Sequence, residues 1–305
     1  MAASTLLSPL AASVREVLSG RTDGQSDIAR AIARPTGAPG WFAPGDAIWT
    51  VHGSVATFVG GIRSLYLQAL HPLALAGVDR HSSYREDPFG RLQRTGAFIA
   101  ATTYGSADLA EQTVGAIRGM HRRVQGTASD GRAYSASDPR LLEWVHISLV
   151  DSMLVAYQHL GHDGGVDADA YVADMAVVGR RMGVEEPPGS QAELAERFAG
   201  FRSELRVDDL VTQTHQFVTN APLPLALRPG YRVLARAAWA SQPDWALQML
   251  DSAPRAAVLD VAAADAALRL LKFALVASPA RMAGEARLAG REDTAAEPDQ
   301  PQGTG

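Results

Sequence analysis

The chain has 305 residues, a formal net charge of −5 and no cysteine. This length suffices for one large domain or two small ones. The charge excludes the broad basic surface that nucleic-acid binding needs, and the missing cysteine excludes disulfides, thiolate haem ligation and cysteine nucleophiles.

The sequence reads as helical almost throughout, and we predict an all-α fold. Three regions are expected: an N-terminal helix and wrapping segment over residues 1–45, one large helical domain over residues 46–290, and a disordered tail over residues 291–305. In the first part of the chain, apolar periodicity predicts helices over residues 4–18, 28–33, 46–70 and 72–80, then a polar loop over residues 81–90 and a helix over residues 91–104.

The next helix should begin at Ser106, a good N-cap, carry Asp108 in its first turn and end before Gly126. A loop over residues 126–137 should follow. Asp138-Pro139 then predicts the start of a helix, Leu141–Leu160, that is apolar on most sides and therefore central. Further helices are expected over residues 167–182, 190–205, 208–219, 231–240, 243–250 and 258–277.

An apolar stretch over residues 48–78 is long enough to suggest a membrane span. It contains His52, Arg63 and His71, whose burial in lipid would be costly, so we interpret it as core helices. The first 20 residues lack a basic leader, and Arg15 and Glu16 interrupt their apolar run. We therefore expect a soluble, cytoplasmic protein with no membrane span.

His121 is the most informative residue. Ala110, Val114, Ile117, His121 and Val124 follow one another at spacings of four, three, four and three, which places them on one helix face. That face is otherwise apolar. A histidine that points into a core needs partners for both ring nitrogens, and binding iron would satisfy one of them. We hypothesise that His121 is the axial ligand of a haem; the alternative is a core histidine bonded to a backbone carbonyl.

Arg91 and Thr95 are four residues apart and share a face of the preceding helix. A guanidinium beside a hydroxyl suits a carboxylate or an oxygen species. The alternative is an ordinary surface arginine and a helix-face threonine.

His146 lies in the most apolar helix and is a second candidate ligand. With Glu143 it forms a Glu-x-x-His motif of the kind that di-iron bundles use, but the chain has no second such motif. The alternative is a hydrogen-bonded core histidine. His71, between an apolar helix and Pro72, is a candidate pocket residue or a structural one.

Several short motifs, in order along the chain, resemble the MpaB-type oxygenase family, which includes the catalytic domain of rubber oxygenases (latex clearing proteins). The resemblance spans residues 45–160, with a further similar region at residues 222–240. The motifs are Gly45-Asp46-Ala47-Ile48-Trp49, Leu70-His71-Pro72, His81-Ser82-Ser83-Tyr84-Arg85-Glu86-Asp87-Pro88, Arg91-Leu92-x-x-Thr95, His121-x-x-Val124-x-Gly126, Tyr134-x-Ala136-x-Asp138-Pro139 and Trp144-Val145-His146.

This resemblance implies a globin-like helical core around a b-type haem, with His121 as the proximal ligand and with Arg91 and Thr95 at the family's arginine and threonine positions. Two differences matter. Rubber oxygenases are exported and the fungal member is membrane-anchored, whereas this sequence shows neither feature. The pocket glutamate of the rubber enzymes also has no match here.

We therefore predict a haem b-dependent oxygenase or oxidase that acts on a small apolar organic substrate with O2 or peroxide. His121 would ligate the iron, Arg91 and Thr95 would act in the haem pocket, and His146 and His71 would line or support it. The alternatives are a haem-binding sensor or carrier, a di-iron helical oxygenase, and a helical interaction protein with structural histidines. The sequence leaves the oligomeric state open.

Overall fold

The computed structural model describes residues 26–34, 37–161, 164–251, 257–275 and 278–295. The fold is all-α, as predicted. In chain order, its elements are α2 (Asp27–Ala33), α3 (Ala47–Gly53), α4 (Thr57–Gln68), α5 (Pro72–His81), α6 (Pro88–Tyr104), α7 (Ala107–His121), β1 (Gln125–Thr127), β2 (Ala133–Ser135), α8 (Pro139–Leu160), α9 (Ala168–Met182), α10 (Gln191–Phe201), α11 (Asp209–Thr219), α12 (Arg228–Ala240), α13 (Asp244–Met249), α14 (Ala257–Leu275) and α15 (Pro279–Ala295).

Local capping signals place the helix starts correctly. The Ser106 hydroxyl accepts a hydrogen bond from the amide of Leu109 at the start of α7. Asp138 caps α8 ahead of a proline in the first turn. Asp167, Ser190 and Asp208 cap α9, α10 and α11 in the same way. These caps satisfy amide groups that the first turn of a helix leaves unpaired, which is why they are visible in the sequence alone.

Three predicted elements differ from the structure. The helix expected over residues 46–70 is two helices, α3 and α4, separated at residues 54–56. The loop expected over residues 126–137 contains an antiparallel hairpin, in which Gly126 pairs with Tyr134. A further helix, α15, follows α14 and continues to Ala295, past the predicted start of the tail at residue 291. The helix predicted over residues 4–18 and the rest of the tail lie outside the described residues.

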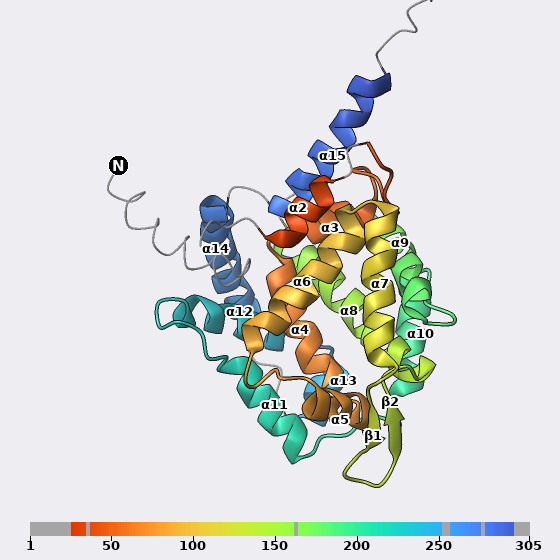
Figure 1. Cartoon of the computed structure of the whole chain (residues 1–305). Helices are drawn as coiled ribbons and strands as arrows, with labels where there is room; N and C mark the ends of the chain where they lie inside the picture. Colours follow the sequence, from red (N-terminus) through yellow and green to blue (C-terminus); the bar gives the residue numbers. More distant parts are fainter. Residues whose placement is uncertain (1–25, 35–36, 162–163, 252–256, 276–277, 296–305) are drawn as a thin grey trace, which may run out of the picture.

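Helices α4 and α8 form the centre of the molecule (Figure 1) and pack along each other. Their close approach depends on Gly60. A Cβ atom at this position would lie 2.8 Å from the sulfur of Met153 and 3.0 Å from the carbonyl oxygen of Ser152 on α8. As predicted, α8 is buried on most sides, including Trp144, which is fully buried. Around this pair, α12 packs on α4, and α9 and α10 pack on α8.

We predict that Gly60→Ala lowers the free energy of unfolding by about 2 kcal/mol, because the added methyl group must push α8 away. The neighbouring Gly61 is the matched control, since a Cβ atom there would meet nothing within 4 Å. Gly61→Ala should raise the free energy of unfolding by up to about 1 kcal/mol through helix propensity. Urea unfolding measures both changes, and a loss of the same size in both variants would contradict the close contact at Gly60.

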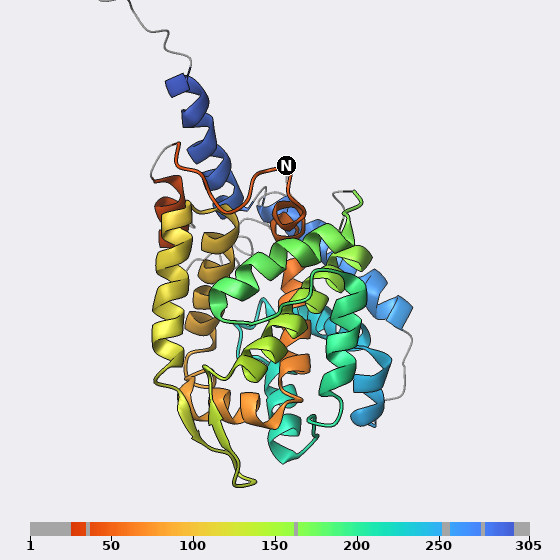
Figure 2. The same ribbon diagram turned by 90° about the vertical axis from the view of Figure 1, so that its right-hand side faces the viewer.

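Helices α6 and α7 form a hairpin that stands beside the central pair (Figure 2). Gly105 and Ser106 make the connection between them, so the two helices run antiparallel and pack on each other. Helices α2, α3 and α15 cover α6, and α9 contacts α7. This hairpin carries three of the predicted site residues.

Candidate functional site

His121 is the last residue of α7 and is half-buried. The predicted apolar face of this helix is present, because Ala110 and Val114 are buried and Ile117 is half-buried. The Nδ1 atom of His121 is buried and has no hydrogen-bond partner among the described residues. Burial also lowers the pKa of the ring below its ordinary value of 6.5. The imidazole is therefore neutral at pH 7, which is the form that ligates a metal.

Arg91 lies in the first turn of α6 and is half-buried. Its Nη1 atom donates a hydrogen bond to the hydroxyl of Ser82 at 2.8 Å, and its guanidinium carbon lies 5.8 Å from the centre of the Tyr84 ring. Burial lowers the pKa of Arg91. Within the described part of the chain the guanidinium has no carboxylate partner. A desolvated cation in this state favours an anion beside it.

Thr95 follows one turn after Arg91 and is exposed. Its hydroxyl donates to the carbonyl oxygen of Arg91 at 3.0 Å, a common bond for a threonine within a helix. The hydroxyl proton is therefore already used, and only the oxygen lone pairs are available to accept a hydrogen bond.

The hairpin brings Arg91, Thr95 and His121 toward the same end of the molecule. Arg91 lies 13 residues before the end of α6 and His121 lies 14 residues after the start of α7. At a rise of about 1.5 Å per residue, both lie about 20 Å from the connection between the two antiparallel helices. The sequence predicted the two helices, and their antiparallel packing places the start of α6 and the end of α7 at the same end of the hairpin.

His146 is buried in α8, with 8% of its surface exposed, and its Nε2 atom has no hydrogen-bond partner in the part of the chain that the structure describes. Its ring lies against the backbone of α9, where a Cβ atom on Gly179 would come within 2.8 Å of the ring Cε1. Burial lowers the pKa of His146 to about 4. A second neutral imidazole with an unpartnered nitrogen is thus held rigidly beside α9.

We predict that His146→Leu makes the protein less sensitive to acid. The unfolded chain protonates this histidine near pH 6.5, whereas the folded protein keeps it neutral down to about pH 4. The unfolded state therefore binds the extra proton, so stability is lost as the pH falls through this interval. As the pH falls from about 6 to about 4.5, the free energy of unfolding of the wild type should decrease by up to about 1.4 kcal/mol more per pH unit than that of the variant. Urea unfolding across this range measures the slopes, and equal slopes would contradict a buried neutral His146.

His71, the N-cap of α5, packs against a face of α8 other than the one that carries His146. Its Nδ1 atom accepts the Ala74 amide at the start of α5, and its Nε2 atom lies 3.4 Å from a carboxylate oxygen of Glu204. Its ring centre is 6.1 Å from that of Trp144. Trp144 and His146 are two residues apart, which is about 200° around a helix. The structure therefore does not bring His71 together with His146.

Comparison with known protein families decides the class of the chain. The family model described as the catalytic domain of ER-bound oxygenase mpaB/B′ and rubber oxygenase matches residues 49–273. The chain belongs to this oxygenase family. The match includes all five predicted site residues and lies within the large helical domain predicted over residues 46–290.

Two relatives carry no assigned activity. An uncharacterised protein of Mycobacterium bovis and one of Mycobacterium tuberculosis are each 27% identical to this chain over 202 residues, which covers 58% of this chain and 79% of the relative. No solved structure matches the chain. Among the described helices, none has the length and apolarity needed to cross a membrane. The described residues also contain no group of three or more His, Cys, Asp or Glu side chains placed to hold a metal ion.

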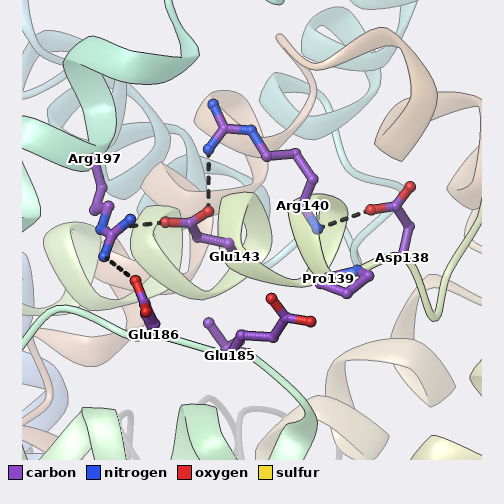
Figure 3. A pocket seen from close by; sticks show the side chains of 8 residues that line it. Asp138, Pro139, Arg140, Glu143, Glu185, Glu186 and Arg197 are labelled. Atoms are coloured by element: carbon purple, nitrogen blue, oxygen red, sulfur yellow. Dashed lines mark hydrogen bonds and ion pairs between the residues drawn. The ribbon is translucent and has the colours of Figure 1, made fainter.

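This member of the oxygenase family has a charged pocket of ≈ 320 Å³ at the start of α8 (Figure 3). Arg197 reaches Glu143 at 3.5 Å and Glu186 at 3.4 Å, and Arg140 reaches Glu143 at 3.1 Å. Arg140 also pairs with Glu204 at 2.7 Å. These ion pairs connect α8 and α10 with the segment after α9. The charged lining does not suit an apolar molecule.

Sequence reasoning missed Tyr84 as part of the arginine environment. The Tyr84 ring lies beneath two guanidinium groups, those of Arg85 at 4.7 Å and Arg91 at 5.8 Å. Its hydroxyl lies 3.4 Å from that of Thr214 on α11, and burial raises its pKa. Tyr84 belongs to the polar loop before α6, where no periodicity marks it. Its place in one of the family motifs was the only signal in the sequence.

Proposed function

We propose that this chain is a haem b-dependent oxygenase or oxidase that acts on a small apolar organic substrate with O2 or peroxide. Membership of the oxygenase family supports the reaction class. The observation that carries the haem assignment is the buried Nδ1 atom of His121, at the end of α7, which has no hydrogen-bond partner within the described ranges. A buried polar atom without a partner is costly, and a ligand that engages the ring offsets that cost.

His121 is the proposed axial ligand. One ring nitrogen would bind the iron, and a hydrogen bond to the other would fix the orientation of the ring. The lowered pKa of His121 favours this role, because no proton has to leave the ring near neutral pH before it can bind.

Arg91 is the proposed partner of a haem propionate. The propionate would supply the negative charge that the half-buried guanidinium lacks among the described residues, and a planar guanidinium can hold a carboxylate through two hydrogen bonds. Thr95, one turn away on the same face, would accept a hydrogen bond in the pocket. Tyr84 would keep Arg91 in place by packing against it.

The remaining residues support the pocket. His146 would present its free Nε2 atom to the cofactor or substrate, with its ring held against α9 at Gly179. His71 would act at a distance, by positioning α8 through its contact with Trp144. A globin-like wrapping of helices around the haem stays a prediction. When bound, the haem would supply the oxidative chemistry, and the protein would supply the site that binds and orients the substrate.

An absorption spectrum of the purified protein tests this proposal, before and after dithionite and carbon monoxide. We expect a Soret band that shifts as in histidine-ligated ferrous haem. A featureless spectrum that persists after addition of hemin would overturn the haem assignment. Two irons per chain without porphyrin would instead establish the di-iron alternative. A six-coordinate iron that does not react with O2 would establish a sensor or carrier.

A further inference from the structure

A second cavity, of ≈ 390 Å³, lies between α5, the loop of the β1–β2 hairpin and the segment that joins α10 to α11. These elements gather at the lower end of the molecule in Figure 1. The cavity shares no lining residue with the charged pocket at α8 or with the proposed haem site. Its volume lies within the range of about 300–1,000 Å³ that small-molecule sites occupy.

The walls of this cavity are apolar, and local bonds hold them in place. Its apolar lining residues are Pro72, Leu75, Ala76, Ala128, Val207 and Leu210. The amide of Arg206 donates to the carbonyl oxygen of Leu70 at 2.9 Å, which fastens the α10–α11 segment to the start of α5. On the other side, Gly131 has a φ of 85°, a conformation that suits glycine, and turns the hairpin so that Ala128 faces α5.

The carboxylates at the rim are already engaged. Asp130 accepts two hydrogen bonds from Arg132, at 3.0 Å from the amide and 2.8 Å from Nε, and these bonds lower its pKa. Asp79 forms an ion pair with Arg85. Asp208 accepts the Val211 amide at 2.9 Å as the cap of α11.

The two arginines of the rim are not paired in this way. Neither Arg80 nor Arg206 has a carboxylate partner in the described regions. The Nη1 atom of Arg206 donates to the carbonyl oxygens of Ser203 and Leu205, at 2.8 and 2.7 Å. These bonds fix the guanidinium, and no described residue occupies its Nε–Nη2 edge, which matches the two oxygens of a carboxylate.

We propose that this cavity binds a small organic carboxylate with an apolar body. The apolar walls would cover the body, and Arg80 and Arg206 would hold the carboxylate at the rim. The three carboxylates of the lining, those of Asp79, Asp130 and Asp208, are engaged by donors of the protein, so the guanidiniums of Arg80 and Arg206 are the charged groups of the lining left to bind an anion.

Calorimetric titration of the full chain with octanoate tests the proposal, with octanol as the uncharged ligand of similar length. We expect one octanoate to bind per chain and octanol to bind at least about tenfold more weakly, because it lacks the charge-assisted hydrogen bonds. Arg80→Gln and Arg206→Gln should each weaken octanoate about tenfold. Val207→Trp, at a partly exposed wall position, should block binding by filling the cavity.

Arg236→Gln is the matched control, because Arg236 is an exposed arginine on α12, outside the cavity, and pairs with Asp260 at 2.9 Å. It should leave octanoate binding unchanged. Three results would overturn the proposal: no binding of octanoate, equal affinity for octanol, or unchanged octanoate affinity in the Arg80→Gln/Arg206→Gln double variant. The last result would show that octanoate binds elsewhere on the molecule. Circular dichroism of each variant confirms that the helical fold is retained.

Discussion

The His121→Ala variant should take up no haem stably while keeping its helical fold. His121 lies at the end of α7 and is only half-buried, so its truncation removes little core packing. We expect about 1 kcal/mol of lost stability, typical of a single substitution. The proposed iron ligand, by contrast, disappears completely. Hemin titration followed at the Soret band measures uptake, and circular dichroism measures the fold.

The matched control is His159→Ala, which removes an exposed histidine near the end of α8. This variant should bind haem as the wild type does. External imidazole should restore the Soret band to His121→Gly, because it can occupy the space of the missing ring and ligate the iron. Full haem retention in His121→Ala would exclude His121 as the ligand. If the Soret band were lost in His146→Ala but kept in His121→Ala, the iron ligand would be assigned to His146 on α8 instead.

The parts of the site that the sequence predicted are those that depend on local chemistry. Ser106 as a cap and the apolar spacing from Ala110 to His121 define α7 without any tertiary information. The spacing of Arg91 and Thr95 likewise defines one face of α6. In these segments propensity, capping and apolar pattern agree, and such agreement makes a local prediction reliable.

The break between α3 and α4 was not predictable from apolar pattern. Val55 and Ala56 resume the apolar run directly after Ser54, and no proline interrupts it. The Ser54 hydroxyl accepts the Ala56 amide, and the Thr57 hydroxyl donates to the Ser54 carbonyl. Side-chain bonds of this kind compete with helix hydrogen bonds, and the tertiary fold decides which of the two forms.

Long-range contacts explain the other differences. The β1–β2 hairpin has strands of three residues, too short for an alternating pattern. A Cβ atom at Gly126 would lie 2.6 Å from the Tyr134 hydroxyl, so a larger residue there would displace the Tyr134 side chain. His71 was a candidate pocket residue by its position before Pro72, whereas its neighbours Glu204 and Trp144 come from distant segments. That the Arg91 guanidinium pairs with no carboxylate among the described residues is likewise visible only in three dimensions.

Arg63→Ala should lower the free energy of unfolding by about 3 kcal/mol or more, the largest stability loss that we expect from one substitution. Arg63 is only 2% exposed. Its Nη1 atom donates to a carboxylate oxygen of Asp151 at 2.6 Å and to the Ser152 hydroxyl at 2.9 Å, both on α8. Its Nε atom donates to the carbonyl oxygen of Ser241 at 2.9 Å, after α12. One side chain thus connects α4 with two of its neighbours, and its removal leaves these acceptors without their donor.

The stability loss in Arg63→Ala follows from the burial of the Arg63 side chain rather than from the ion pair with Asp151 itself. Breaking a buried pair by removing one partner typically costs 3–5 kcal/mol, whereas exposed pairs contribute about 0–1 kcal/mol. Asp151 is 22% exposed and can recover some hydration, so we expect the lower end of that range.

Arg236→Ala, which breaks the exposed pair with Asp260, is the control and should lower the free energy of unfolding by less than about 1 kcal/mol. The double variant Arg63→Met/Asp151→Asn should be more stable than Arg63→Ala, because it leaves no unpaired carboxylate and keeps apolar volume. Urea unfolding measures the free energy of unfolding of all three variants. Equal losses in Arg63→Ala and Arg236→Ala would show that the burial of Arg63 does not determine the stability lost when its ion pair is broken.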